Sequence, residues 1–242
     1  MNEVHGCRVA VTGGTSGLGL ALVRELRARG AQVALVARGR SGVERAVQTA
    51  PSVHGVVGDI SKKEDIYPTA LQILGALGGL DVLVNNASAL GPAPLALLAD
   101  TECEDFERAL ATNLFGPFRL TKALLGALAA SAREGRGVLV LNISSDAALT
   151  PYPRWGAYGA SKAALHHMTR IWGEELKGER IQFLSLDPGD MDTALHHIAV
   201  PDADRSSLKR PEDAAREVAD AICAAVSAEA RTSLALAEAC AP

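Results

Sequence analysis

Two side chains that together could move a proton lie beyond the middle of the sequence. Tyr158 and Lys162 are four residues apart in a segment of helical pattern, residues 157–177, so both lie on one face of the predicted helix. Reduction of a carbonyl by hydride needs an acid that protonates the developing alkoxide, and oxidation of an alcohol needs the reverse. A phenol, with an ordinary pKa of about 10, is a poor base at neutral pH, but a neighbouring ammonium favours its charged form. The pair therefore predicts a tyrosine general acid/base and a lysine that lowers its pKa.

A serine hydroxyl could complete this pair. Ser145 follows the apolar segment 138–143, which we interpret as a strand, and it precedes Tyr158 by 13 residues. A hydroxyl held at a strand end can donate a hydrogen bond to a carbonyl oxygen and hold it beside the phenol. A tyrosine four residues before a lysine also arises by chance on surface helices, so the argument depends on all three residues. The adjacent Ser144 is interpreted as structural.

These residues lie in a chain in which short apolar runs alternate with longer segments of helical pattern. The continuous apolar runs are typical of strands covered on both faces. Strict alternation predicts parallel pairing and right-handed crossovers, hence an α/β fold with a doubly wound parallel sheet of Rossmann type and helices on both faces. No composition break marks a linker, so we expect one domain over residues 1–242. The predicted strands span residues 8–12, 32–37, 53–57, 80–85, 138–143 and 181–186, and the predicted helices span residues 17–29, 41–50, 62–77, 103–132, 157–177 and 211–227.

A glycine-rich loop, residues 12–19, joins the first predicted strand to the first predicted helix. Such a junction turns backbone N–H groups and the positive end of a helix toward one point, which suits a pyrophosphate. Gly13 allows the tight turn, Gly17 lets the backbone approach the phosphates, and Gly19 permits close packing of helix on strand. Glycine-rich turns also occur in α/β folds that bind no ligand; the position after the first strand favours a dinucleotide site.

The spacing Gly-x-x-x-Gly-x-Gly, together with Ser145, Tyr158 and Lys162, resembles the short-chain dehydrogenase/reductase family. The resemblance covers about residues 7 to 227 and implies a nicotinamide-dependent oxidoreductase that acts on a carbonyl or a secondary alcohol. It also implies that Asn113 distorts the helix predicted over residues 103–132 and supports a proton relay between the lysine and solvent. On position alone, a buried asparagine bonded to backbone is the preferred interpretation of Asn113, and the presence of the other three residues favours the functional role. The implied catalytic residues are Asn113, Ser145, Tyr158 and Lys162.

The end of the second predicted strand bears on which dinucleotide is bound. An acidic residue there accepts hydrogen bonds from the ribose 2′-hydroxyl and repels a 2′-phosphate. This chain has Ala37 at that position, followed by Arg38, whose guanidinium can hold a phosphate through two hydrogen bonds. We therefore expect NADP(H) rather than NAD(H), while a merely solvated Arg38 stays an open alternative.

Three further motifs resemble the family's cofactor contacts. Asp59 follows the third predicted strand, where the family's aspartate accepts the adenine amino group, and it also fits a local helix cap. Residues 85–88 resemble Asn-Asn-Ala-Gly with serine in the last place, and residues 188–193 resemble Pro-Gly-x-x-x-Thr. The cofactor-binding residues implied in this way are Gly13, Thr15, Ser16, Gly17, Leu18, Gly19, Arg38, Asp59, Ile60, Asn86, Ala87, Ser88, Tyr158, Lys162, Pro188, Gly189, Met191 and Thr193.

Residues 190–211 are polar and irregular, and we interpret them as a substrate lid. His196 and His197 lie in this segment without a third ligand at metal-binding spacing, so we expect a solvent-facing pair and no metal site. An apolar pocket for a medium-sized carbonyl or secondary alcohol is suggested by Leu90, Leu149, Tyr152, Trp155 and Met191.

The composition limits which binding partners and which cellular location we expect. The 242 residues are 48% hydrophobic and 21% charged, which excludes a disordered chain. The net charge of −4 does not indicate binding to nucleic acid or to an anionic membrane. We expect no signal peptide and no membrane span, because the first eight residues carry no apolar segment and the uncharged stretch 82–99 contains asparagines and prolines. Four cysteines without a CxxC pair fit a reducing, cytoplasmic location. The expected partners are a small-molecule substrate and further copies of the chain, as a homodimer or homotetramer, with residues 123–130 as one contact surface.

Two other hypotheses stay open. A dinucleotide-binding sensor or scaffold keeps the fold without turnover, but it need not retain all four polar catalytic residues. A sugar-nucleotide epimerase or dehydratase of the extended relatives needs a longer C-terminal region and typically shows Gly-x-x-Gly-x-x-Gly.

The last residues, 233–242, depart from the seventh strand and the Asp-Gly-Gly turn typical of the family. This departure argues against a tetramer that forms through that edge of the sheet.

Overall fold

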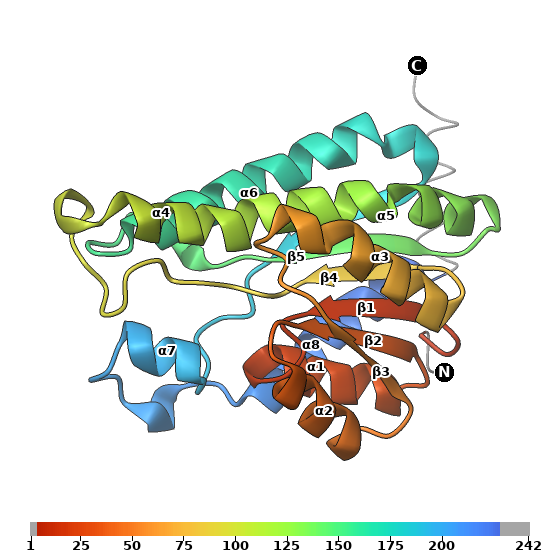
Figure 1. Cartoon of the computed structure of the whole chain (residues 1–242), viewed down its shortest axis with the longest axis horizontal. Helices are drawn as coiled ribbons and strands as arrows, with labels where there is room; N and C mark the ends of the chain where they lie inside the picture. The colour runs from red at the N-terminus through yellow and green to blue at the C-terminus, as the bar shows by residue number, and fades with distance from the viewer. Residues whose placement is uncertain (1–3, 228–242) are drawn as a thin grey trace.

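A computed structural model describes residues 4–227 and shows a six-stranded sheet between two layers of helices (Figure 1). The strand order is β3-β2-β1-β4-β5-β6 and every neighbouring pair is parallel, which confirms the predicted doubly wound α/β sheet. The strands are β1 (Arg8–Thr12), β2 (Gln32–Ala37), β3 (Val53–Val57), β4 (Val82–Asn85), β5 (Val138–Ile143) and β6 (Ile181–Leu186).

The central strands are apolar because helices cover them on both faces. All residues of β5 are buried, and in β1 only Arg8 is partly exposed. A strand without a solvated face shows a continuous apolar run in place of alternation. β4 begins at Val82, two residues later than predicted. Asp81, just before it, is fully buried and accepts hydrogen bonds of 2.7 Å from Nη2 of both Arg8 and Arg136, which ties the start of β4 to β1 and to the segment before β5.

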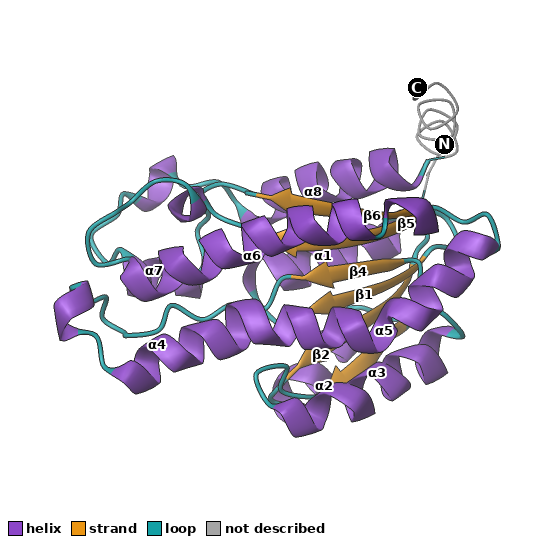
Figure 2. Ribbon diagram, turned by 90° about the horizontal axis from the view of Figure 1, so that it is seen from above, coloured by secondary structure: helices purple, strands orange, loops and turns teal. Residues whose placement is uncertain are grey.

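The helices divide between the two faces of the sheet (Figure 2). One face carries α1 (Gly17–Ala28), α2 (Arg40–Thr49) and α8 (Pro211–Val226), whose apolar residues form one core cluster with the strands. The other face carries α3 (Lys63–Leu77) and α5 (Gly116–Arg133) around a second cluster. On the same face α6 (Gly156–Glu175) packs on β6, and the rings of Phe118 and Trp172 join it to α5. Because all six strands are parallel, the loop that follows each strand lies at the same edge of the sheet, at the carboxyl ends of the strands.

The helix predicted over residues 103–132 is interrupted. The structure has α4 (Cys103–Leu110), then a π-helical turn over Ala111–Phe115, then α5. The interruption coincides with Asn113, which is fully buried. Single π turns inside α-helices are frequent at functional sites. The distortion that the family resemblance implied at Asn113 is thus present.

The segment predicted to be an irregular lid contains a short helix, α7 (Ala194–Ala199), and a 3₁₀ turn over Arg205–Ser207. Oγ1 of Thr193 accepts a hydrogen bond of 3.2 Å from the backbone N–H of His196 and so caps α7. In Figure 1, α7 lies apart from the main helical layers, on the side to which the carboxyl ends of the strands point.

The expected departure from a seventh strand falls on residues 233–242, which lie outside the described residues. Between residues 4 and 227, no helix combines the length and the apolar character needed to cross a membrane.

Candidate active site

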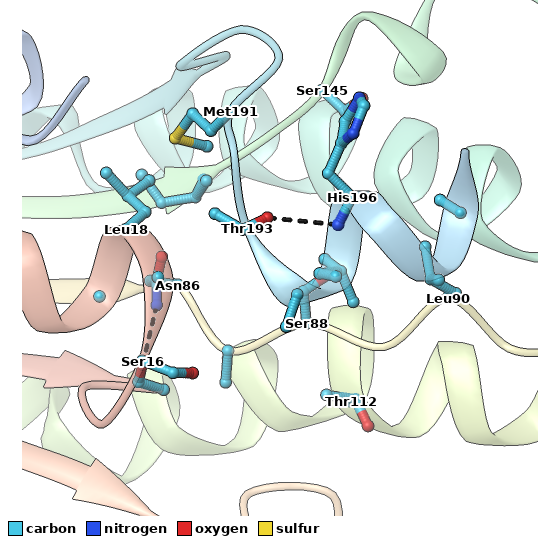
Figure 3. Close-up of a pocket in the computed structure, with 18 of the residues that line it drawn as sticks. Ser16, Leu18, Asn86, Ser88, Leu90, Thr112, Ser145, Met191, Thr193 and His196 are labelled. Carbon is cyan, nitrogen blue, oxygen red and sulfur yellow. Dashed lines mark hydrogen bonds between the residues drawn. The ribbon is translucent and has the colours of Figure 1, made fainter. Parts of the chain in front are cut away.

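A cavity of about 730 Å³ lies at the carboxyl ends of the strands (Figure 3). In open α/β sheets, ligands bind outside these strand ends where the strand order reverses, and the volume is in the range of small-molecule and cofactor sites. Every residue that the sequence assigned to cofactor binding lines this cavity, as do the predicted catalytic residues Ser145, Tyr158 and Lys162. Asn113, the fourth predicted catalytic residue, is buried behind the cavity wall.

The glycine-rich loop forms one end of the cavity. Gly13 and Gly17 have φ of 68° and 50°, the left-handed region that favours glycine. α1 starts at Gly17 without an acidic residue in its first turn, and the side chain of Ser16 does not cap it. The first N–H groups of α1 and its positive end are therefore available to a ligand. These groups fit the pyrophosphate of a dinucleotide.

Gly19 and Asn86 hold the segment after β4 against this loop. A Cβ on Gly19 would overlap the carbonyl oxygen of Gly13 and the side-chain amide of Asn86. Nδ2 of Asn86 donates to the carbonyl of Thr12 at 2.8 Å, and Oγ1 of Thr12 accepts from the backbone N–H groups of Asn86 and Ala87 at 3.0 and 3.1 Å. Residues 86–88 consequently run along the cavity, as the resemblance implied.

The ends of β2 and β3 form another part of the wall. Ala37 and the exposed Arg38 line the cavity, so no carboxylate stands at the end of β2. Asp59 lines it as well, and its Oδ1 accepts hydrogen bonds from the N–H and the hydroxyl of Ser61 at 3.0 and 2.7 Å. Asp59 therefore does cap the local turn, and its place in the wall keeps an adenine contact possible.

The three residues predicted to carry the chemistry meet where β5 ends. Tyr158 and Lys162 lie one turn apart on α6 and are 8% and 2% exposed. Nζ of Lys162 donates a 2.7 Å hydrogen bond to the carbonyl of Ile143 and lies 5.5 Å from the centroid of the Tyr158 ring. The hydroxyl of Ser145 lies beside the phenol of Tyr158 and acts to lower its pKa. The indole of Trp155 packs edge-on against the Tyr158 ring, with centroids 5.5 Å apart.

Burial controls the protonation of this pair. Desolvation raises the pKa of Tyr158 to about 12, and hydrogen bonds with Ser145 and Ser88 act in the opposite direction. Desolvation lowers the pKa of Lys162 to about 8, although the carboxylate of Asp187 raises it. At pH 7, Tyr158 is therefore a neutral phenol and Lys162 is mostly an ammonium. The expected lowering of the tyrosine pKa is not met in this structure, because loss of water around the phenolate outweighs the interactions that stabilise it.

Ser145 is held by its own turn. Its Oγ donates to Oδ1 of Asp146 at 3.0 Å and accepts from the backbone N–H of Ala147 at 3.2 Å. The hydroxyl of Tyr152 donates to Oδ2 of the same carboxylate at 2.7 Å. These contacts fix the hydroxyl of Ser145 at the end of β5, where the sequence placed it.

Asn113 clamps the segment after β4 to α6. Its Nδ2 donates to the carbonyl of Ala89 at 2.8 Å and to Oγ of Ser161 at 2.9 Å. Its Oδ1 accepts from the N–H of Ala89 at 2.8 Å and from Oγ of Ser88 at 3.2 Å. The hydroxyl of Ser88, which Asn113 holds, also acts on the phenol of Tyr158 and lowers its pKa.

The contact between Ser88 and Tyr158 predicts a measurable shift in pH dependence. Ser88→Gly, which restores the residue typical of the family's motif, removes a hydrogen bond that lowers the pKa of Tyr158. We expect the basic-form limb of the pH profile for alcohol oxidation to move to higher pH, because the phenolate loses one of the contacts that stabilise it. Ser88→Thr keeps the hydroxyl and should keep the wild-type limb. The measurement is kcat/KM against pH for all three proteins, and superimposable profiles for wild type and Ser88→Gly would contradict the contact.

The lid reaches across the cavity to the glycine-rich loop. Gly189 has φ of 77°, which lets the chain turn after β6. The methyl of Thr193 lies over Gly17, at 3.2 Å from where a Cβ on Gly17 would stand. Figure 3 shows Met191, Thr193 and His196 of the lid on the cavity that Ser16, Leu18 and Asn86 also border.

Several lining residues were missed by the sequence reasoning. Leu195 and Ile198 recur at helical spacing, and Thr193 stands at the cap position before them, which are the signals that could have revealed α7. The missed residues from the lid and the neighbouring turns include Thr112, Asp146, Asp187, Asp190, Leu195, His196, Ile198, Ala199 and Val200.

Two expectations about the substrate end were wrong. His196 and His197 are not a solvent-facing pair: the His196 side chain is 13% exposed and lines the cavity, and Nε2 of His197 is 2.6 Å from Oδ1 of Asp192. Leu149 does not contribute to an apolar pocket, because it is 77% exposed and outside the cavity lining. The other residues named for that pocket, Leu90, Tyr152, Trp155 and Met191, do line the cavity. No group of three histidine, cysteine or acidic side chains that could hold a metal ion occurs within the described part of the chain.

Comparison with known proteins identifies related sequences along most of the chain. The sequence model of a family described as short chain dehydrogenase matches residues 8–203. Glucose 1-dehydrogenase of Gluconobacter oxydans strain 621H is 31% identical over 229 residues, which cover 90% of this chain and 84% of that protein.

Solved structures agree with this similarity. The 3-ketoacyl-(acyl-carrier-protein) reductase of Brucella melitensis, complexed with NADH, superposes with a TM-score of 0.83 at 28% identity, covering 89% of this chain and 90% of the other. A short chain dehydrogenase of Shigella flexneri 2a, complexed with NADP, superposes with a TM-score of 0.80 at 24% identity, covering 88% and 90%, which supports the fold alone.

Proposed function

Because the chain belongs to the short-chain dehydrogenase family, we propose that it is an NADP(H)-dependent oxidoreductase acting on a carbonyl compound or the corresponding secondary alcohol. The observation that carries this proposal is that Ser145, Tyr158 and the buried Lys162 meet in one cavity, which extends to the glycine-rich loop. A nicotinamide dinucleotide held there would donate or accept the hydride. The chain itself has to orient the substrate and supply the proton.

Orientation and proton transfer fall to two hydroxyls. In reduction, Ser145 donates a hydrogen bond to the carbonyl oxygen and holds it beside the phenol. Tyr158 gives its proton to that oxygen as negative charge develops on it. At pH 7 burial keeps Tyr158 neutral, which is the form that this step requires.

Lys162 and Asn113 support the phenol. The ammonium of Lys162 stabilises the phenolate that is left after proton donation, and it also anchors the ribose of the cofactor in this proposal. Asn113 holds Ser88 against Tyr158 and so supports the relay that returns a proton to the phenol. Water is excluded from the pair because both side chains are almost fully buried.

The preference for NADP(H) has a direct test at Arg38. Arg38→Ala removes the guanidinium that we place on the 2′-phosphate, so NADPH binding should weaken by about 10- to 100-fold while NADH binding changes by less than about twofold. Ala37→Asp places a carboxylate at the end of β2 and should reverse the preference by repelling the phosphate. Fluorescence titrations with NADPH and NADH give all the dissociation constants.

Arg45→Ala is the matched control. Arg45 is exposed on α2 and does not line the cavity, so this variant changes the net charge equally without touching the site. Equal affinity of the wild type for NADPH and NADH, or an Arg38→Ala variant that behaves like Arg45→Ala, would refute the assignment.

The activity itself is tested by a screen. Purified full-length protein is mixed with NADPH and a panel of aldehydes and ketones, and in parallel with NADP⁺ and secondary alcohols, while absorbance of the reduced cofactor is followed. We expect turnover of at least one carbonyl/alcohol pair. Tight dinucleotide binding without turnover of any compound would instead support a sensor or scaffold.

We also propose a small-molecule substrate, self-association and a cytoplasmic location. The exposed apolar residues Phe115, Phe118 and Ile171, together with the partly exposed small residues of the stretch 123–130, support a contact between copies over α5 and α6 as a homodimer or homotetramer. Cys7, Cys103 and Cys223 are free thiols, which supports a reducing compartment. The acidic net charge supports neither nucleic acid nor a membrane as a partner.

A further inference from the structure

His196 carries a buried polar atom that has no partner. Its side chain is 13% exposed and lines the cavity, and its Nδ1 is buried without a hydrogen-bond partner among the described residues. In Figure 3 the imidazole projects from α7 toward the side of the cavity on which Ser145 lies. A buried nitrogen left without a hydrogen bond is destabilising, so such groups are rare unless they meet water or a ligand.

The neighbouring histidine shows that this arrangement is not a general property of the lid. Nε2 of His197 is 2.6 Å from Oδ1 of Asp192, and the same carboxylate binds the guanidinium of Arg205. His197 does not line the cavity. It therefore serves the internal structure of the lid, whereas His196 lines the cavity and its Nδ1 is left without a partner among the described residues.

The surroundings of His196 indicate which tautomer it adopts. Nε2 of His196 lies 3.9 Å from Oδ1 of Asp190. A carboxylate on that side favours the proton on Nε2, which leaves Nδ1 as an acceptor. The group that meets Nδ1 must then be a hydrogen-bond donor.

The charges around the substrate end exclude an acidic ligand group. Asp146, Asp187 and Asp190 line the cavity near the catalytic pair and the lid. Among the lysines and arginines of the described residues, only Arg38 and Lys162 line it, and Arg38 stands at the far wall after β2. A carboxylate or phosphate on the substrate would meet like charges without a free arginine to bind it.

We propose that His196 is a specificity-determining residue: its Nδ1 accepts a hydrogen bond from a hydroxyl of the substrate other than the reacting one. The substrate is accordingly an uncharged hydroxylated carbonyl compound, or the polyol that its reduction yields, and the apolar side chains of Leu90, Trp155 and Ile198 cover its carbon skeleton. This inference rests on the proposed oxidoreductase function and names the substrate class within it.

The test compares probes that share one carbon skeleton. Cyclohexanone, 2-hydroxycyclohexanone, 4-hydroxycyclohexanone and 4-oxocyclohexanecarboxylate are each offered with NADPH to the wild type. We expect at least one hydroxylated ketone to exceed cyclohexanone in kcat/KM by about tenfold, which is the effect of one well-placed hydrogen bond, and the carboxylate to be the poorest substrate.

Three substitutions of His196 distinguish the effect of the position of its polar atom from the effect of side-chain size. His196→Asn places a polar atom at the same number of bonds from the backbone as Nδ1, and should keep most of the preference. His196→Gln places the polar atom where Nε2 stands, and His196→Ala removes it. In both variants KM for the hydroxylated ketone should rise about tenfold, so that the preference for this ketone over cyclohexanone is lost. For both, kcat/KM for cyclohexanone should stay within about twofold of the wild type. His197→Ala, on the same helix, is the control for a general disturbance of the lid and should keep the preference.

The outcomes distinguish this inference from the proposed function. If the wild type turns over ketones but prefers cyclohexanone or the carboxylate, or if His196→Ala keeps the hydroxyl preference, the assignment of His196 is wrong and the oxidoreductase function stands. If none of the four probes is turned over while a wider carbonyl panel is, the substrate class is wrong. If no carbonyl compound is turned over by protein that binds NADPH, the proposed function fails and the inference fails with it.

Discussion

Tyr158→Phe is expected to lower kcat by about 10²- to 10⁴-fold, which is the usual contribution of a general acid/base. The substitution removes only the hydroxyl that bonds to Ser145 and Ser88. The ring stays packed against Trp155, at a centroid distance of 5.5 Å, so the shape of the cavity is kept. The dissociation constant for NADPH, measured by fluorescence titration, should therefore change by less than about twofold.

Tyr67→Phe provides the matched control for this loss. Tyr67 lies on α3, is 69% exposed and does not line the cavity, so removal of its hydroxyl should leave both kcat and cofactor binding unchanged. Turnover by Tyr158→Phe at the wild-type rate would refute the role of Tyr158. Loss of NADPH binding in the same variant would mean that the hydroxyl serves the cofactor in place of the proton transfer.

Lys162→Met should abolish most of the activity and at the same time make the protein more stable at pH 7. The lysine side chain is 2% exposed, and burial lowers its pKa from 10.5 to about 8. At pH 7 the folded protein therefore holds an ammonium in a poorly solvated place, which costs about 3 kcal/mol when the difference of 2.5 pKa units is converted at 1.36 kcal/mol per unit. Methionine fills a similar volume without a charge. The carbonyl of Ile143 then loses its hydrogen-bond donor, and this loss reduces the gain in stability by about 1 kcal/mol or more.

The pH dependence of this stability difference has a definite sign. Between pH 8 and 10.5 the unfolded chain binds a proton at residue 162 that the folded chain has already lost, so the stability of the wild type rises with pH in this window. Lys162→Met lacks this titration. Its stability advantage over the wild type should consequently be largest below pH 8 and decline by about 2 to 3 kcal/mol by pH 10.

Urea unfolding of both proteins at pH 7 and pH 10 measures this difference. Lys177→Met is the control, because Lys177 is exposed in the 3₁₀ turn after α6 and should show neither the activity loss nor the pH-dependent gain. A stability difference between wild type and Lys162→Met that does not change with pH would contradict the lowered pKa of Lys162. Full activity of Lys162→Met would refute its role in the site.

Local patterns in the sequence were sufficient to predict the sheet and the glycine-rich loop at one end of the cavity. The apolar runs of β1 and β5 predict their burial because a strand covered on both faces has no other composition. Gly13 and Gly17 predict the loop because glycine adopts positive φ without strain, and Gly19 predicts it because a Cβ there would overlap its neighbours. In each case the property belongs to the residue itself or to its near neighbours in the chain.

The protonation of Tyr158 and Lys162 was not predictable in this way. Tyr158 and Lys162 were placed correctly side by side, but the pKa of Tyr158 is raised where a decrease was expected. The spacing of four residues determines that the two groups approach each other. How much water reaches them depends on Trp155, on β5 and on the segment after β4, which come from distant parts of the chain.

The chain's sequence by itself determined the six strands and the long helices between them, the glycine-rich turn and the residues that carry the proposed chemistry, because these follow from periodicity and from backbone preferences that act over a few residues. Only the tertiary structure decided that His196 faces the cavity while His197 faces Asp192, and that Asn113 clamps Ser88 against Tyr158. Adjacent residues with the same side chain differ here because burial and hydrogen bonding depend on which remote segments pack around each of them, and that information is not local.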